Sequence, residues 1–178
     1  MPSNLLEKSC SNRLAPELRP SCLTNKESGG ESRAWLNPAS PRQKFTGLRI
    51  LFMDEEEMIR HLARLMLELL GCEVEVATSG EEAIHLYREG QRQERPFQAV
   101  IFDLTVDSGM GGAEALGQLR KRDPQIRAII SSGYTYDPII LAAPDHGFKC
   151  ALVKPYNLEE LYLAVATAFA AEANSPAQ

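Results

Sequence analysis

Four apolar stretches of the chain each end in a polar residue whose type could take part in phosphoryl chemistry. An acid pair follows the first stretch, a single acid the second, a serine pair the third and a lysine the fourth. A carboxylate can attack phosphorus or bind a metal ion, and hydroxyl and ammonium groups can neutralise phosphoryl oxygens. The residues are Asp54 and Glu55 after 48–53, Asp103 after 99–102, Ser131 and Ser132 after 128–130, and Lys154 after 151–153.

These stretches belong to a regular alternation of strand-like and helix-like segments. Short apolar runs predict strands, and apolar residues at intervals of three and four predict helices. Five such pairs predict an α/β fold, a doubly wound five-stranded parallel sheet with helices on both faces. Ligands bind beyond the carboxyl ends of the strands in such a sheet, so the polar residues should meet there. The expected strands are 48–53, 73–77, 98–102, 126–131 and 150–153, and the expected helices include 56–70, 112–122, 138–143 and 158–171.

Two of the expected helices carry recognisable start signals. Ser79 with Glu82, and Asn157 with Glu160, have the spacing of a capping box. Apolar spacing then indicates which residues should face the sheet. They are Ile59, Leu62, Met66 and Leu69 in 56–70, Ala83, Ile84, Leu86 and Tyr87 after Ser79, and Leu158, Leu161, Val165, Ala168 and Phe169 in the last helix.

The gathered acids predict a metal site. Two carboxylates about 5 Å apart repel by roughly 3 kcal/mol at an effective dielectric constant of about 20, so a cluster favours a bound cation or proton uptake. Oxygen ligands without nearby His or Cys select a hard cation, here Mg²⁺. We expect Asp54 and Asp103 to bind it directly and Glu55 directly or through a water. As a carboxylate, Asp103 could also be the nucleophile that accepts a phosphoryl group.

Several of these segments resemble the receiver domain of bacterial two-component response regulators. The matching segments are ILFMDEEEMIR, VIFDLTV, IISSGY and LVKPY, in that order. The segment MGGAEALGQLRKRDPQIRAIISSGY is most similar to receivers attached to hybrid sensor histidine kinases. The resemblance covers roughly residues 46–171 and implies a flavodoxin-like sheet with strand order 2-1-3-4-5.

The resemblance also assigns roles to single residues. It implies that Asp103 accepts a phosphoryl group from a histidine kinase or phosphotransfer protein, with Lys154 and Ser132 neutralising phosphoryl oxygens. Ser132 is favoured over Ser131 because the family's hydroxyl residue directly precedes a small residue. The family pattern adds the backbone carbonyl of Thr105 as a Mg²⁺ ligand. Such a protein would catalyse only its own phosphorylation and dephosphorylation.

Three positions depart from the family pattern. Ala151 replaces an aromatic residue that usually takes part in switching, and Asp107 replaces a proline. Pro144 is expected to shorten the fourth helix, because proline lacks an amide donor and clashes with the preceding turn. These departures leave the acceptor residues in place and bring the usual switching mechanism of the family into question.

Two other functions compete with phosphorelay signalling. A receiver-like interaction module would keep the fold without cycling phosphate, which Ala151 and Asp107 favour slightly. A haloacid dehalogenase-type phosphatase also uses an aspartyl nucleophile, and VIFDLTVD is superficially similar to its first motif. In that superfamily the nucleophile precedes the acid pair and another Asp follows two residues later, whereas here the acids come first and that position is Thr105.

Composition predicts the domain boundaries, the kinds of partner and the cellular compartment of the protein. Residues 1–45 hold five of the eleven prolines, seven serines and a net charge of +3, which predicts a flexible tail or linker before a domain at 46–171, followed by a short tail at 172–178. The remaining charge of −8 argues against nucleic-acid binding. The four scattered cysteines and the lack of a signal peptide or an apolar run of membrane-spanning length predict a cytoplasmic protein that binds no membrane.

The last expected helix has few polar residues on any side. From residue 161 to 171 only Tyr162 and Thr167 carry a polar side-chain group. A solvated helix normally shows charges opposite its buried stripe. Either alanine is tolerated there as a strong helix former, or the outer face, expected to include Ala164 and Ala171, binds a partner or a second copy. We therefore expect a homodimer or partner contact through this helix, biased by phosphorylation of Asp103.

Overall fold

The computed structural model describes residues 45–107 and 109–170. The predicted tails at 1–45 and 172–178 lie outside these residues, apart from Phe45. Strands and helices alternate along the described part of the chain, as predicted. The strands are β1 (Arg49–Met53), β2 (Glu73–Ala77), β3 (Ala99–Asp103), β4 (Ala128–Ser132) and β5 (Cys150–Val153), and the helices are α1 (Glu57–Leu69), α2 (Gly80–Arg92), α3 (Gly112–Arg120), α4 (Pro138–Leu141) and α5 (Leu158–Phe169).

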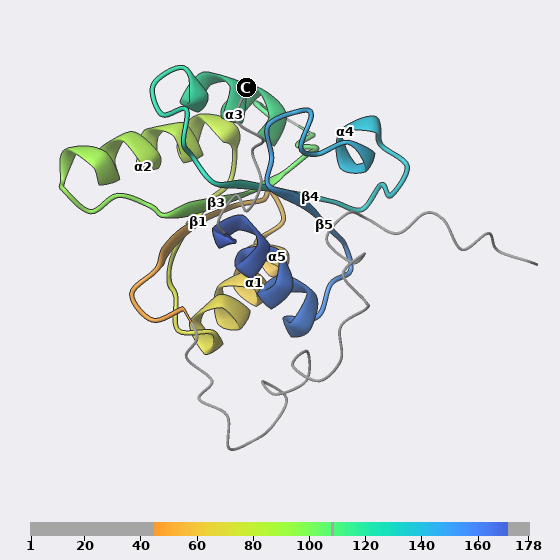
Figure 1. Cartoon of the computed structure of the whole chain (residues 1–178), viewed down its shortest axis with the longest axis horizontal. Helices are drawn as coiled ribbons and strands as arrows, with labels where there is room; N and C mark the ends of the chain where they lie inside the picture. Colours follow the sequence, from red (N-terminus) through yellow and green to blue (C-terminus); the bar gives the residue numbers. More distant parts are fainter. Residues whose placement is uncertain (1–44, 108, 171–178) are drawn as a thin grey trace, which may run out of the picture.

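The five strands form one parallel sheet with the order β2-β1-β3-β4-β5. Helices α1 and α5 lie on one side of this sheet, and α2, α3 and α4 lie on the other (Figure 1). The predicted doubly wound, flavodoxin-like sheet with order 2-1-3-4-5 is therefore confirmed. Parallel strands covered on both faces must bury side chains on both faces, which explains their continuous apolar sequences.

Side chains alternate along each strand between two apolar layers. In β3, Ile101 packs in the layer with α1 and α5, while Phe102 packs in the layer with α2, α3 and α4. In β4, Ile129 and Ile130 divide in the same way. This alternation sets the direction of the polar residues that follow, because successive strand residues point to opposite faces.

The inward face of α1 agrees with the sequence prediction only for Ile59 and Met66, which are partly buried against the core. Ala63 and Leu67 are its buried residues, whereas Leu62 and Leu69 are exposed. The apolar face of α1 is broad and lies opposite a charged strip, so spacing alone did not identify which part of that face packs on the sheet. The small side chain of Ala63 lets the helix approach the strands closely at that point.

The predicted capping boxes are formed to different extents. At α5, Asn157 accepts from the backbone N–H of Glu160 and the Glu160 carboxylate accepts from the N–H of Asn157, as predicted. At α2, the Ser79 hydroxyl accepts from the N–H of Glu82. The Glu82 carboxylate instead accepts from the N–H and hydroxyl of Thr78, so this box is only half formed.

Helix α4 has four residues and ends at Leu141, two residues earlier than predicted. The Asp137 carboxylate caps it by accepting from the N–H of Ile139 at 2.8 Å. A residue before a proline avoids helical backbone angles, so Pro144 disfavours helix at Ala143. The shortening expected from Pro144 is confirmed. Across residues 45–107 and 109–170, no helix combines the length and apolar character that crossing a membrane would require.

Helix α5 buries Leu161 and Val165, as predicted, and Leu158 and Phe169 are half-buried. Ala164 was expected on the outer face, but it is fully buried against the sheet. The error arises because alanine fits a tightly packed interface as well as it fits an exposed helix surface. Any outward contact of α5 must therefore use other residues.

Candidate functional site

Asp54, Asp103 and Lys154 meet at the carboxyl edge of the sheet. The Lys154 ammonium lies 2.6 Å from Asp54 Oδ2 and 3.1 Å from Asp103 Oδ2. Asp54 is fully buried and Asp103 is 5% exposed. The convergence predicted from strand ends is therefore present for these three residues. Asp103 is the last residue of β3, whereas Asp54 and Lys154 directly follow their strands.

The backbone around Asp54 is held from several directions. Its N–H donates to the carbonyl of Ala77 at the end of β2, and its carboxylate accepts from the N–H of Glu56 at 3.0 Å. The Arg60 guanidinium donates to the backbone carbonyls of Asp54 and Glu55 at 2.8 and 2.6 Å. These contacts fix the direction of the Asp54 side chain, and the sequence did not single out Arg60.

Burial raises the pKa of Asp103 from 3.8 to about 6. The Lys154 ammonium opposes this rise and the neighbouring Asp54 carboxylate adds to it. Burial alone would lower the pKa of Lys154, but the hydrogen bond to Asp54 and the two negative charges outweigh it, so its pKa is raised. Lys154 therefore remains an ammonium group between two carboxylates.

Glu55 and Thr105, the other predicted metal ligands, lie beside this group. The Glu55 carboxylate accepts from the N–H of Asp107 at 2.9 Å, so it ties the β3–α3 loop to the end of β1. Thr105 is exposed in the same loop. Among residues 45–107 and 109–170, no three His, Cys, Asp or Glu side chains are arranged to hold a metal ion.

The oxygen atoms at this site are nevertheless of the type that binds Mg²⁺. Asp54 and Asp103 provide carboxylate oxygens at an open sheet edge, and the loop after β3 provides backbone carbonyls. Mg²⁺ needs only one or two carboxylates because it keeps several of its waters. The residues present therefore fit a partly hydrated Mg²⁺, and Glu55, which follows β1, is held next to the loop after β3 by the hydrogen bond from Asp107.

The two serines at the end of β4 face opposite sides of the sheet. Ser131 pairs with Asp103 and follows Ile129 on the face covered by α1 and α5. Ser132 follows Ile130 on the other face, and its hydroxyl accepts from the N–H of Tyr134 at 3.0 Å. Both serines are fully buried. Ser132 thus lies one residue beyond the position in β4 that pairs with Asp103.

Tyr156 is a further residue near the acids that the sequence interpretation did not include. Burial raises its pKa most, and the charges of Asp54 and Asp103 raise it further. The phenol therefore stays neutral beside the two carboxylates. Its position two residues after Lys154 was the available signal.

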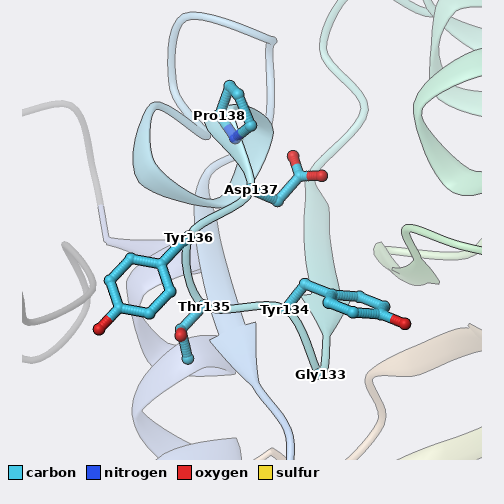
Figure 2. Close-up of a pocket in the computed structure, with 6 residues that line it drawn as sticks. All are labelled: Gly133, Tyr134, Thr135, Tyr136, Asp137 and Pro138. Carbon is cyan, nitrogen blue, oxygen red and sulfur yellow. The ribbon is translucent and has the colours of Figure 1, made fainter.

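The loop that follows Ser132 forms an open pocket of about 550 Å³. Figure 2 shows the side chains of Tyr134 and Tyr136 pointing away from each other along this loop. They are 69% and 74% exposed. The pocket therefore presents aromatic surface in the loop between β4 and α4. It is lined by Gly133, Tyr134, Thr135, Tyr136, Asp137 and Pro138.

Comparison with known proteins identifies the family. Residues 50–166 match the sequence family described as the response regulator receiver domain. The match covers more than half of the chain, so the chain belongs to the receiver domain family of two-component response regulators. This membership supports the receiver interpretation over the phosphatase alternative.

Individual relatives agree with this assignment. The chain is 30% identical over 112 residues to the uncharacterized transcriptional regulatory protein YkoG of Bacillus subtilis, covering 63% of this chain and 46% of that protein. It is 29% identical over 112 residues to chemotaxis protein CheY of Thermotoga maritima, covering 62% and 88%. The structure of response regulator protein TrrA of Thermotoga maritima, in complex with Mg²⁺ and BeF, is similar with a TM-score of 0.58 and 29% identity, covering 68% and 98%. The chain thus spans less than half the length of YkoG.

Proposed function

We propose that this protein is a phosphorelay receiver in which Asp103 takes a phosphoryl group from a phosphohistidine on a histidine kinase or phosphotransfer protein. The observation that carries the proposal is the buried Asp54–Lys154–Asp103 group at the edge of a receiver-type sheet. Phosphorylation then alters a surface that a partner recognises. The reactions proposed for the chain are only its own phosphorylation and dephosphorylation.

The chemistry follows from the position of the charges. One Asp103 carboxylate oxygen attacks phosphorus, a new O–P bond forms, and the bond from phosphorus to the donor nitrogen breaks. The electron pair stays on the leaving imidazole. Positioning and neutralisation account for most catalysis of such transfers. Lys154 would neutralise one phosphoryl oxygen, and we propose that Ser132 contacts another from the rim of the site.

Mg²⁺ is the proposed cofactor, held by the carboxylates of Asp54 and Asp103, by the backbone carbonyl of Thr105, and by Glu55 directly or through a water. When bound, it supplies positive charge to phosphoryl oxygens. TrrA was crystallised with Mg²⁺ and BeF, which supports the same cofactor here. Asp54 is fully buried, whereas Glu55 is only partly buried, so we expect Asp54 to contribute more than Glu55 to Mg²⁺ binding.

We expect Asp54→Ala to weaken Mg²⁺ binding at least about tenfold from a millimolar to submillimolar value, because a partly hydrated ion has few protein ligands to lose. Glu55→Gln should weaken it less, because the Glu55 carboxylate is engaged by Asp107. Calorimetric or fluorescence titration of both variants measures the difference. An Asp54→Ala protein with unchanged affinity would remove Asp54 from the coordination shell.

An interaction module without phosphate cycling remains the second candidate function. Ala151 supports it, because it is fully buried and leaves its strand without the aromatic residue expected in a switching receiver. The intact Asp103 and Lys154 oppose it. Intact-mass measurement after incubation with Mg²⁺ and acetyl phosphate distinguishes the two, since a receiver gains one phosphoryl group.

Helix α1 carries a surface suited to the phosphoryl donor. Met58, Leu62, Leu65 and Leu69 are 84%, 50%, 46% and 55% exposed, at intervals of four, three and four residues. Such spacing forms one apolar seam on a helix and packs against another helix. The seam begins four residues after Asp54, so it adjoins the acidic site. We propose that it binds a helix of the kinase or phosphotransfer protein.

The variant Leu62→Glu/Leu65→Glu tests this surface. We expect phosphotransfer from the protein donor to slow at least about tenfold, because two charges would enter an apolar contact. Labelling by acetyl phosphate should not change, since this small donor needs no helix contact. As a control, Arg122→Glu alters an exposed residue on the other side of the sheet. Equal rates for both donors in the double variant would contradict the proposal.

Self-association through α5 also remains a proposal. Leu163 and Ala166 are half-buried residues that supply apolar surface on the outer side of this helix. Tyr162, which stacks on Phe45, extends this surface. Receiver phosphorylation would bias the monomer–dimer equilibrium through this face.

We expect a larger weight-average mass in sedimentation when phosphodonor is present, and loss of this increase in Ala166→Glu. Ala166 is the test position because it is only half-buried, whereas a charge at the fully buried Ala164 would disrupt the packing of the helix on the sheet. Thr167→Glu, at the next, exposed position, is the matched control for an added charge. A protein that stays monomeric in both states would leave α5 as an alanine-rich helix without this role.

A further inference from the structure

Ser131 carries a buried hydroxyl to which the proposed phosphoryl transfer assigns no role. Its side chain is fully buried, and its oxygen is one of two buried side-chain polar atoms in the described residues that lack a hydrogen-bond partner. Burying a hydroxyl without a partner costs about 1–3 kcal/mol, so alanine would fill this place at lower cost. We therefore expect the hydroxyl to gain a hydrogen-bond partner in another state of the protein.

Sheet register identifies that partner. Ser131 in β4 is directly paired with Asp103 in β3. Both follow residues of the layer under α1 and α5, namely Ile129 and Ile101, so both side chains leave the sheet on the same face. Lys154 follows Leu152 of the same layer. Asp54, Asp103, Ser131 and Lys154 thus lie on one face of the sheet, although Ser131 itself pairs with Leu152 and Lys154 lies two residues further along the chain.

The geometry allows contact between the two side chains. Neighbouring strands lie about 4.8 Å apart, and side chains at paired positions stand side by side. Rotation of a serine about one bond can therefore bring its hydroxyl to a carboxylate on the adjacent strand. In the structure the Lys154 ammonium contacts Asp103 Oδ2 at 3.1 Å. The two donors are alternatives for the same acceptor.

We propose that Ser131 is a positioning residue whose hydroxyl donates to the non-attacking oxygen of Asp103 when Lys154 turns to the phosphoryl group. As Asp103 bonds to phosphorus, the donor's bond to phosphorus breaks and the leaving group keeps the electron pair. The second Asp103 oxygen becomes a carbonyl and loses the ammonium. The hydrogen bond from the Ser131 hydroxyl replaces the one from the Lys154 ammonium and fixes the orientation of the Asp103 carboxyl group. This inference rests on the proposed function of Asp103.

The test compares Ser131→Ala, Ser131→Cys and Ser131→Thr by intact-mass labelling rates over a range of acetyl phosphate concentrations in saturating Mg²⁺. We expect Ala and Cys to lower the maximal rate about 3- to 10-fold without changing the half-saturating donor concentration, as loss of one hydrogen bond in the transition state predicts. Thr keeps the hydroxyl and should stay within about twofold of the unmodified protein. Cys72→Ala, a buried change at the amino end of β2 in the same apolar layer, should label normally.

Thermal unfolding of the unphosphorylated variants separates positioning from packing. Because the hydroxyl has no partner to lose in this state, Ser131→Ala should melt at or above the temperature of the unmodified protein. Labelling of Ser131→Ala at the normal rate, or equal slowing in Ala and Thr, would overturn the role of Ser131 alone. Failure of the unmodified protein to be labelled would overturn this inference together with the proposed function.

Discussion

Replacement of Asp103 by asparagine is expected to abolish phosphoryl labelling by acetyl phosphate while the protein stays folded. The amide has nearly the same shape as the carboxylate but lacks the negative oxygen that attacks phosphorus. Intact mass after incubation with Mg²⁺ and the phosphodonor gives the result directly. Asp107→Asn is the matched control, because Asp107 is an exposed carboxylate four residues along the same loop.

The same Asp103→Asn variant should be more stable than the unmodified protein without Mg²⁺. Burial and the Asp54 charge raise the pKa of Asp103, so its ionised form is unfavourable in the folded protein. Removing this charge should add about 1–3 kcal/mol to the free energy of unfolding at pH 7. A variant that still gains a stable phosphoryl group, whatever its stability, would show that Asp103 is not the acceptor.

The sheet could be derived from sequence because each strand is a short, continuous apolar run. Residues such as 99–102 and 150–153 have no polar position on either face, which only a strand covered on both sides requires. Their order in space does not follow from these runs. It came from the family resemblance, and the structure confirmed it.

The facing of helices was less predictable where the apolar face of the helix is broad. In α1 the choice between Leu62 and Ala63 as inward residue depends on how closely the helix approaches β1, which no local spacing encodes. Ala164 of α5 presented the same ambiguity. In α2 polar residues mark the outer side, and the predicted inward residues Ala83 and Tyr87 are indeed buried.

The sequence predicted which residues meet at the acidic site, because they follow neighbouring strands. It did not predict the contacts that each side chain makes there. Asp54, Asp103 and Lys154 converge as expected because parallel strands end at one edge. The engagement of Glu55 by Asp107 depends on the path of a loop, and it was not foreseen. The choice between Ser131 and Ser132 relied on the family pattern, whereas strand register places Ser131 beside Asp103.

Replacing Lys154 by methionine is expected to cause the largest loss of stability of any single change at the site. Methionine keeps the length of the side chain but leaves the buried Asp54 and Asp103 without an opposite charge. Removing one partner of a buried ion pair costs about 3–5 kcal/mol. Urea unfolding at pH 7 without Mg²⁺ measures this loss, and Lys121→Met, on the exposed end of α3, is the control.

The loss should depend on pH in a defined direction. The pKa of Asp103 in the folded protein is about 6, above its ordinary value of 3.8, so this residue adds stability at low pH that disappears as pH rises through 6. Without Lys154 the pKa rises further, because the ammonium is what holds it down. Lys154→Met should therefore recover part of its lost stability between pH 7 and pH 5. If its deficit is the same at both pH values, the ionisation of Asp103 does not depend on Lys154.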